Sequence, residues 1–280
     1  MTGTLLSLGH GYSARALARL LLPRGWRIIG TTRSAEKAAV LENEGIEPRI
    51  WPGTDLSKDI AAATHILANA GPGPDGDPFL TGIGAQLREA RPVWVGYLST
   101  TGVYGDHGGG WVDEDTPLAP STERGQMRVA AETAWRDTGL PLHIFRLAGI
   151  YGPGRGPFAK LRAGRARRII KPGQVFSRIH VDDIAQVLAA SMAQPAPGRV
   201  YNLCDDDPAP PQDVIAHAAK LLNLPLPPAV DFDEADMSPM ARSFYAESKK
   251  VRNDRIKREL GVQLIHPDYR SGLAAEAGTA

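Results

Sequence analysis

Cysteine is almost absent from this chain: of its 280 residues, only Cys204 is a cysteine. One thiol cannot close an intramolecular disulfide or build a cysteine-rich metal site, so we expect a reducing compartment. The chain has seven histidines. None of them forms a His-Glu-x-x-His pattern or lies beside the cysteine in a zinc-type spacing, so we expect no metal site.

Long apolar runs and an excess of charge of one sign are also lacking. The first apolar stretch, residues 5–8, is too short for a signal sequence, and no stretch approaches the roughly 18 to 20 apolar residues of a membrane span. The formal net charge is +1, whereas nucleic-acid binders normally carry a clear basic excess. We therefore expect a soluble, cytoplasmic protein whose partner is a small molecule, not a membrane or a nucleic acid.

Apolar runs typical of buried strands alternate with stretches of helical periodicity. Strands are expected at 4–8, 26–31, 47–51, 65–70, 93–98, 142–147 and 199–203, and helices at 13–22, 35–44, 57–62, 79–90, 123–138 and 182–193. This alternation predicts an α/β fold with a doubly wound, mainly parallel sheet of the Rossmann type.

The last third of the chain is less regular. Proline and glycine cluster at 149–157 and 205–211, and they are followed by a helical stretch at 213–222 and an amphipathic stretch at 248–260. We expect a dinucleotide-binding core formed by residues 1–155, which also receives about 178–204. Residues 156–177 and 205–280 are expected to form a small substrate-binding cap.

A glycine-rich turn lies between the first strand and the first helix. It reads Gly9-His10-Gly11-Tyr12-Ser13-Ala14, which is a G-x-G-x-x-A pattern. At this position the backbone has to turn tightly, approach a pyrophosphate and direct helix N–H groups at it. The turn therefore predicts a dinucleotide site that includes Gly9, Gly11, Tyr12, Ser13 and Ala14.

The end of the second strand indicates which dinucleotide binds. An NAD-specific site carries an Asp or Glu about 20 residues after the turn, where it binds the ribose 2′-hydroxyl. This chain has Thr31, Thr32 and Arg33 there. Arg33 is able to pair with a 2′-phosphate, with support from the threonine hydroxyls, so we expect NADP, with NAD as the second choice.

Five segments, spread in order over residues 1 to about 205, resemble the extended short-chain dehydrogenase/reductase family, the group of NAD-dependent epimerases and dehydratases. The similarity is to an atypical branch that carries the same serine-threonine-glycine-valine-tyrosine-glycine string. The segments are the glycine turn, Leu98-Ser99-Thr100-Thr101-Gly102-Val103-Tyr104-Gly105, Glu114 with Pro117, the run Arg-Leu-Ala-Gly-Ile-Tyr-Gly-Pro-Gly-Arg at 146–155, and Arg178-Ile179-His180-Val181-Asp182-Asp183-Ile184.

The catalytic centre departs from that family's pattern of Ser or Thr, then Tyr-x-x-x-Lys, then Glu. Thr100 matches the hydroxyl and Glu132 the glutamate, but Arg124 and Arg128 stand at the Tyr and Lys positions. Arginine stays protonated, with a pKa above about 12, and cannot serve as a general acid or base. The resemblance implies that Arg128 reaches the nicotinamide ribose and that Arg124 places positive charge beside a substrate anion or oxyanion.

Three further features have a structural and a functional interpretation. Tyr104 is the phenol nearest to the missing tyrosine, although a pocket-lining role is favoured. His180 and Asp182 are expected to fix a helix start, with Asp182 or Asp183 as the N-cap. A solvated face explains most of a basic run, with a wall for an anionic substrate as the alternative; its members are Arg155, Lys160, Arg162, Arg165, Arg167, Arg168 and Lys171.

The sequence thus predicts an NADP-dependent oxidoreductase or epimerase-like enzyme for a small polar metabolite, with anionic compounds such as sugar nucleotides included. The catalytic candidates are Thr100, Tyr104, Arg124 and Arg128. The alternative is a non-catalytic NADP(H)-binding sensor or scaffold, which the two arginines favour. A homodimer is left open.

Overall fold

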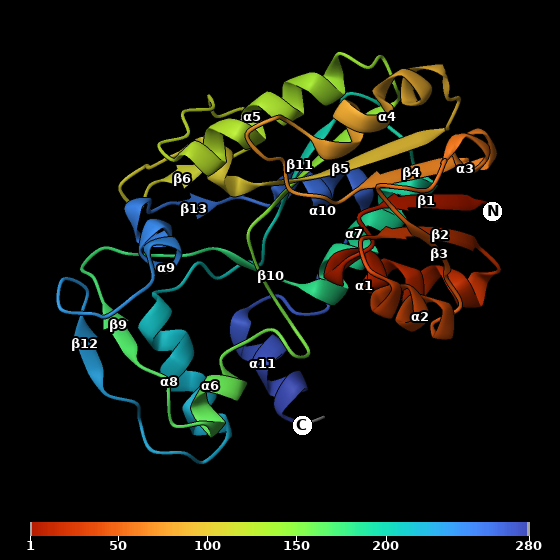
Figure 1. Cartoon of the computed structure of the whole chain (residues 1–280). Coiled ribbons are helices and arrows are strands. Elements are labelled where there is room, and N and C mark those ends of the chain that lie inside the picture. The colour runs from red at the N-terminus through yellow and green to blue at the C-terminus, as the bar shows by residue number, and fades with distance from the viewer. Residues whose placement is uncertain (1, 279–280) are drawn as a thin grey trace.

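A seven-stranded parallel sheet is the centre of the computed structural model, which describes residues 2–278 (Figure 1). The strand order is β11-β7-β5-β4-β1-β2-β3, and every neighbouring pair is parallel. This confirms the expected α/β fold. The strands are β1 (Thr4–Leu8), β2 (Arg27–Thr32), β3 (Glu47–Ile50), β4 (His65–Ala68), β5 (Trp94–Thr100), β7 (Leu142–Leu147) and β11 (Val200–Leu203).

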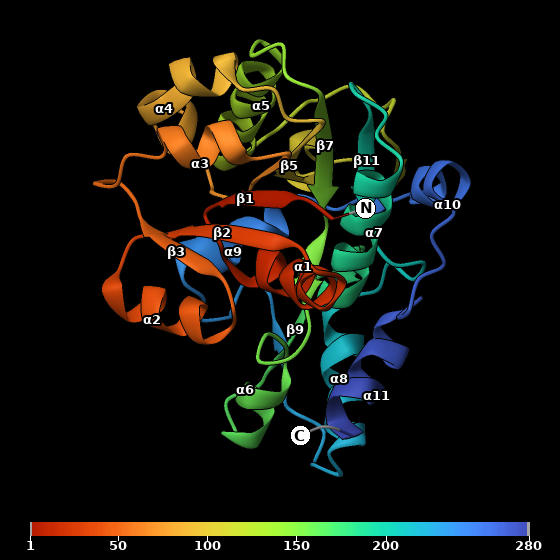
Figure 2. The same ribbon diagram turned by 90° about the vertical axis from the view of Figure 1, so that its right-hand side faces the viewer.

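Helices cover both faces of this sheet, as Figure 2 shows. One layer packs around the buried Leu17 and Ile184, the other around Phe79 and Trp135. The first layer contains α1 (Tyr12–Leu21), α2 (Ala35–Asn43) and α7 (Val181–Ala193), and the second contains α3 (Ser57–Ala62), α4 (Pro78–Glu89) and α5 (Glu123–Arg136). The sheet is therefore doubly wound, and its strand order reverses between β1 and β4, where ligands of such sheets bind beyond the carboxyl ends of the strands.

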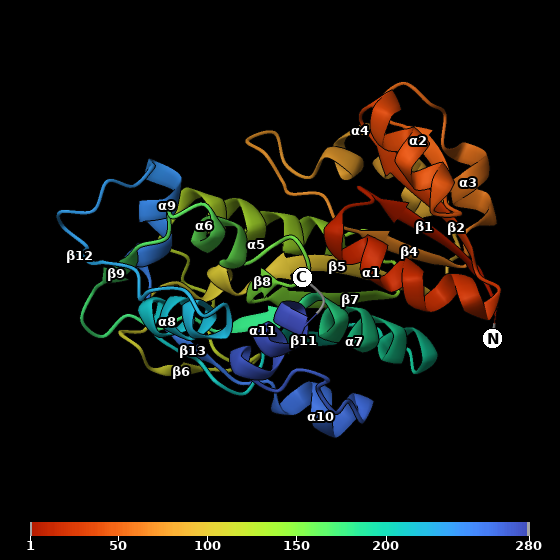
Figure 3. The same cartoon turned by 90° about the horizontal axis from the view of Figure 1, so that it is seen from below.

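A smaller assembly extends from the carboxyl edge of the sheet. It has its own apolar cluster, in which Phe158, Ala218 and Leu273 are buried. Figure 3 shows α6, α8, β9 and β12 at the end of the molecule opposite α2 and α3. Its helices are α6 (Phe158–Arg162), α8 (Pro211–Leu221), α9 (Pro239–Ser243) and α11 (Tyr269–Gly278), and its paired strands are β8 (Gly149–Tyr151) with β10 (Arg178–His180) and β9 (Arg168–Ile170) with β12 (Ala229–Asp231).

The segment 248–260 differs from the expectation. Its first part is strand β13 (Lys250–Val251), which pairs with β6 (Trp111–Val112), because the backbone N–H of Lys250 donates to Gly110 instead of continuing a helix. Helix α10 covers only Asp254–Leu260, and its Ile256 is buried in the cluster of α1 and α7, so this helix packs on the core and not in the expected cap. Within residues 2–278, no helix has the length and apolarity needed to span a membrane.

Candidate functional site

The glycine turn is held by backbone contacts at the end of β1. Gly9 has φ +80°, and a Cβ there would lie 3.1 Å from the backbone nitrogen of Ala70, so this position requires glycine. The N–H of Gly9 donates to Thr31 Oγ1 (2.6 Å). Thr31 is buried and its hydroxyl holds the turn, which corrects the expectation that it supports a 2′-phosphate.

The N-terminus of α1 is open toward the carboxyl edge of the sheet. Its N-cap is Gly11, which offers no side chain to its first-turn N–H groups. A Cβ on Gly11 would make only ordinary contacts, the nearest 3.6 Å from Asn69 Nδ2. Ser13 and Ala14 are buried at the helix start, and Tyr12 donates its hydroxyl to the carbonyl of Pro153 (3.0 Å). These uncapped N–H groups and the positive end of the helix dipole suit an anion.

The end of β2 carries positive charge and no carboxylate. Thr32 is half-buried, and Arg33 is exposed and forms no ion pair with any residue in the described range 2–278. The following Ser34 caps α2 by accepting from the N–H of Lys37 (3.3 Å). Thr32 and Arg33 thus remain available to an anion at this strand end.

Arg128 is fixed between β5 and the loop after β4. Its Nη1 donates to Tyr97 Oη (3.0 Å) and to the carbonyl of Leu98 (2.8 Å). A Cβ on Gly71 would lie 3.6 Å from Nη2 of the same guanidinium. Gly71 directly follows Ala70, which touches the glycine turn, so Arg128 lies beside the place where the turn would hold a dinucleotide.

Thr100 and Arg124 lie on two segments in close contact. Thr100 Oγ1 accepts from the N–H of Gly102 (3.2 Å) at the start of the turn η2 (Thr101–Tyr104). A Cβ on Gly125 would lie 3.0 Å from the carbonyl oxygen of Gly102, so the first turn of α5 packs directly on this turn. Arg124 is exposed there, one helical turn before Arg128, and its guanidinium lies 5.5 Å from the ring centre of Phe244.

Tyr104 is not exposed to a ligand, which corrects its place among the catalytic candidates. Its side chain is fully buried, and its hydroxyl donates to Asn202 Oδ1 (2.7 Å) and accepts from Arg146 Nη1 (3.0 Å). Burial raises the pKa of Tyr104 to about 12. A phenol enclosed in this way cannot reach a substrate to transfer a proton.

Glu132 is the centre of the same buried network. Its carboxylate accepts from Ser99 Oγ (2.6 Å) and from Arg146 Nε (3.1 Å) and Nη2 (2.9 Å), and it is fully buried. The network therefore fixes α5 on the sheet. Arg146 and Asn202 were not identified from the sequence as parts of this network, because an arginine or asparagine on a strand gives no signal of burial.

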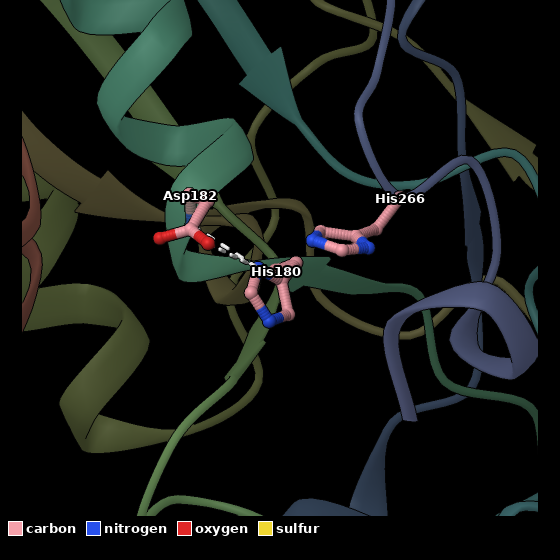
Figure 4. A group of neighbouring side chains, drawn as sticks. All are labelled: His180, Asp182 and His266. Atoms are coloured by element: carbon pink, nitrogen blue, oxygen red, sulfur yellow. Dashed lines mark hydrogen bonds and ion pairs between the residues drawn. The ribbon is translucent and has the colours of Figure 1, made fainter. Parts of the chain in front are cut away.

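His180, Asp182 and His266 lie together where α7 begins (Figure 4). His180 is the N-cap: its Nδ1 accepts from the N–H of Asp182 (3.2 Å). This corrects the expectation of an aspartate cap; Asp183 instead accepts from the N–H groups of Ile265 (2.7 Å) and His266 (3.1 Å). Burial, with a smaller contribution from His266, lowers the pKa of His180 to about 4.

The same three side chains have metal-ligand chemistry, since one ligand atom from each lies within 4.8 Å of the others. However, the lone pair of His180 Nδ1 already accepts a backbone N–H, and this nitrogen is the one that faces Asp182 Oδ2, at 3.7 Å. The arrangement in Figure 4 is therefore a helix cap, and it does not leave that nitrogen free for a metal.

Most residues of the basic run are exposed, and some of them also have contacts. Lys160, Arg162, Arg165 and Arg167 are exposed, as a solvated face requires. Arg155 is exposed as well and lies over the Tyr12 ring, as Arg162 lies over the Phe158 ring. Arg168 donates to the carbonyl of Pro227, and Lys171 donates to the carbonyl of Tyr245.

Sequence reasoning missed two parts of the site. The loop Asn69-Ala70-Gly71 lies between the glycine turn and Arg128, and its signal was its place directly after a buried strand. Phe244 approaches Arg124 from a segment more than 100 residues further along the chain, and the sequence carries no sign of that contact.

Comparison with known proteins gives a consistent result. The family described as the NAD dependent epimerase/dehydratase family matches residues 85–204. Protein YeeZ of Escherichia coli K12 is 27% identical over 93% of this chain and 95% of its own. A Streptomyces 3-diazoavenalumate denitrifying reductase is 29% identical over 59% of each chain.

Solved structures share the whole fold. A functionally unknown conserved protein from Silicibacter pomeroyi is 62% identical and superposes over 99% of both chains with a TM-score of 0.94. Human epimerase family protein SDR39U1 with NADPH gives a TM-score of 0.79 at 18% identity over 100% of both chains. Bacillus cereus UDP-glucuronic acid 4-epimerase with NAD gives 0.78 at 19% identity over 99% of this chain and 98% of its own.

Proposed function

We propose that this chain is an NADP(H)-dependent oxidoreductase for a small polar, anionic metabolite, on the basis of the NAD-dependent epimerase/dehydratase family model that matches residues 85–204. The observation that carries the proposal is the open N-terminus of α1 at Gly11, beside a β2 end where Arg33 stands without a carboxylate partner among residues 2–278. The structure with NADPH and the structure with NAD, both of this fold, support a nicotinamide dinucleotide in general.

The residues present fit such a cofactor. Gly9 and Gly11 keep the backbone free of side chains where a pyrophosphate would meet the first turn of α1. Thr32 and Arg33 would hold a 2′-phosphate, which a nearby Asp or Glu would repel. Arg128, fixed by Tyr97 and Leu98, would direct its remaining N–H groups at the nicotinamide ribose.

The chemistry of the site is electrostatic. A bound nicotinamide supplies or accepts the hydride. A guanidinium is a fixed cation that binds anions, so the role of Arg124 is to stabilise negative charge on the substrate. Thr100, whose oxygen already accepts the N–H of Gly102, keeps its O–H to orient a substrate oxygen. The name of the Streptomyces relative, a reductase, supports reduction as the direction to test first.

A non-catalytic NADP(H) sensor is the second candidate, and one observation favours it. At the positions where the resemblance places the family's Tyr and Lys, this chain has Arg124 and Arg128, and Arg128 is already engaged by Tyr97 and Leu98. Fold and cofactor binding can persist where chemistry has been lost.

Two measurements test these functions. Calorimetric titration with NADPH and NADH tests the cofactor, and we expect the tighter binding for NADPH. The NADPH complex is then mixed with a panel of carbonyl acids and sugar nucleotides while nicotinamide absorbance is followed. Turnover that falls in Arg124→Ala supports the enzyme; cofactor binding without turnover of any substrate favours the sensor; and absence of binding to either cofactor would refute both.

A further inference from the structure

Arg124 carries a charge that no acid of the described chain neutralises. It forms no ion pair within residues 2–278, and it precedes Arg128 by one helical turn on the same face of α5. Two like charges four residues apart repel each other and destabilise a helix. The guanidinium is exposed at the carboxyl edge of the sheet, where an anion would remove this repulsion.

The surface beside this guanidinium is apolar. Phe244 begins the turn η3 (Phe244–Ala246), is 53% exposed, and lies with its ring under Arg124 at 5.5 Å. Met240, four residues earlier, is 69% exposed on the same side of this short helical segment. Two large apolar side chains, one helical turn apart, are thus exposed, and one of them contacts a cation without an acid partner among residues 2–278, an arrangement that suits a ligand with an apolar part and an anionic part.

Contacts on its C-terminal side hold this segment beside α5. Glu247 accepts from Ser121 Oγ (2.7 Å), just before the first turn of α5, and from Lys249 Nζ (2.6 Å). Lys249 also donates to the carbonyl of Gly105 (2.6 Å). These contacts engage Glu247 and Lys249. Two further cations of this region, Lys171 and Arg242, donate to the carbonyls of Tyr245 and Ala235. Arg124 therefore stays beside Phe244 without an acid partner among residues 2–278.

We propose that Arg124, Phe244 and Met240 form the substrate subsite, and that the substrate is a small carboxylate attached to an aromatic or unsaturated apolar body. The guanidinium binds the carboxylate by paired N–H groups, and the ring and thioether cover the apolar body. A sugar nucleotide fits less well, because a diphosphate needs several cations, and a sugar ring needs polar partners in place of Phe244 and Met240. This inference rests on the proposed function, in which Arg128 holds the nicotinamide ribose and Thr100 orients a substrate oxygen.

Ligand binding tests the inference without any turnover. The protein, alone and saturated with NADPH, is titrated by calorimetry with cinnamate, cinnamyl alcohol, glucuronate and UDP-glucose. We expect cinnamate to bind at least 10-fold more tightly than each of the other three. Arg124→Gln should weaken the binding of cinnamate about 10-fold or more, and Phe244→Ala should weaken it about 5-fold. Arg165→Gln, which removes an exposed arginine from the basic run, is the matched control and should change nothing.

The outcomes separate the inference from the proposed function. Equal or tighter binding of glucuronate or UDP-glucose, or cinnamate affinity unchanged in both variants, overturns the subsite. If NADPH binds and cinnamate does not, the subsite is wrong and the cofactor proposal stands. If cinnamate binds through Arg124 while NADPH does not bind, the subsite stands and the proposed function fails. Thermal unfolding of each variant shows that a loss of binding is not a loss of fold.

Discussion

The first turns of α1 and α5 face the same edge of the sheet, but they offer an anion different groups. In α1 the N-cap is Gly11, so backbone N–H groups are presented without a side chain. In α5 the N-cap is Thr122, whose Oγ1 accepts from the N–H of Gly125 (3.1 Å), so charge is presented by Arg124 and Arg128 instead. A backbone site tolerates changes of side chain around it, whereas a side-chain site changes its chemistry with each substitution.

The largest expected effect is a loss of stability when the buried network under α5 is broken. Glu132→Ala leaves Arg146 charged and unpaired in the interior, which should cost about 3–5 kcal/mol of unfolding free energy. Urea unfolding measures the loss. Glu123→Ala, on the exposed first turn of the same helix, is the control and should cost less than about 1 kcal/mol. A similar cost for the two variants would mean that the buried network does not fix α5.

Gly11→Val tests the backbone site of α1. Gly11 has φ −109°, so valine is compatible with the backbone, but its side chain would occupy the phosphate position. We expect NADPH affinity to fall at least about 100-fold, or ~2.7 kcal/mol, with circular dichroism unchanged. Gly9→Val is the contrast: φ +80° and the contact with Ala70 should make it lose stability as well. Retained binding in Gly11→Val would show that the glycines serve the turn alone.

Arg33→Ala tests the charge at the end of β2. Loss of a hydrogen bond to a charged phosphate should weaken the binding of NADPH by about 1.5–3 kcal/mol and leave the binding of NADH almost unchanged. Titration of wild type and variant with both cofactors measures this. Equal affinities of the unmodified protein for NADPH and NADH would contradict the assignment.

His10 links the glycine turn to the pH dependence of stability. Burial lowers its pKa to about 4, and neither ring nitrogen has a hydrogen-bond partner among the described residues. The unfolded chain, with a histidine pKa near 6.5, therefore binds the proton first, and stability is lost as pH falls from about 6.5 toward about 4.

His10→Leu should remove that loss. From pH 7.5 to pH 5, the unfolding free energy of the wild type should fall by about 2 kcal/mol more than that of the variant. Urea unfolding at the two pH values measures the difference, with His107→Leu as the control. Parallel pH curves for wild type and His10→Leu would exclude this role.

The smallest expected effect is a difference in NADPH affinity between variants of the two arginines of α5. Arg128→Ala should weaken NADPH by about 1 kcal/mol, since part of its hydrogen bonding is already used by Tyr97 and Leu98. Arg124→Ala should leave NADPH unchanged, because its guanidinium lies over Phe244. Calorimetric titration of the two variants with NADPH measures both affinities. A larger loss in Arg124→Ala would place the cofactor on the other arginine.

Much of the fold follows from local sequence. The expected strands and helices of the sheet agree with the structure within a few residues, because buried parallel strands are continuous apolar runs and the helices between them have clear periodicity. The glycine turn could also be predicted from the sequence, because the backbone geometry at Gly9 requires glycine. Strand β13 was not, because it depends on a partner strand 139 positions earlier, which pairs Lys250 with Trp111.

The sequence by itself determined the parallel sheet, the glycine turn after β1, and the placement of Arg124 and Arg128 one helical turn apart, since each is fixed by residue type and local spacing. Only the tertiary structure decided that Tyr104 is enclosed by Arg146 and Asn202, that His180 caps α7, and that Phe244 lies under Arg124. The contacts of Tyr104 and Phe244 join segments far apart in the chain. The histidine cap is local, but like them it depends on which side chains the packed sheet and cap bury. A linear pattern does not encode that burial.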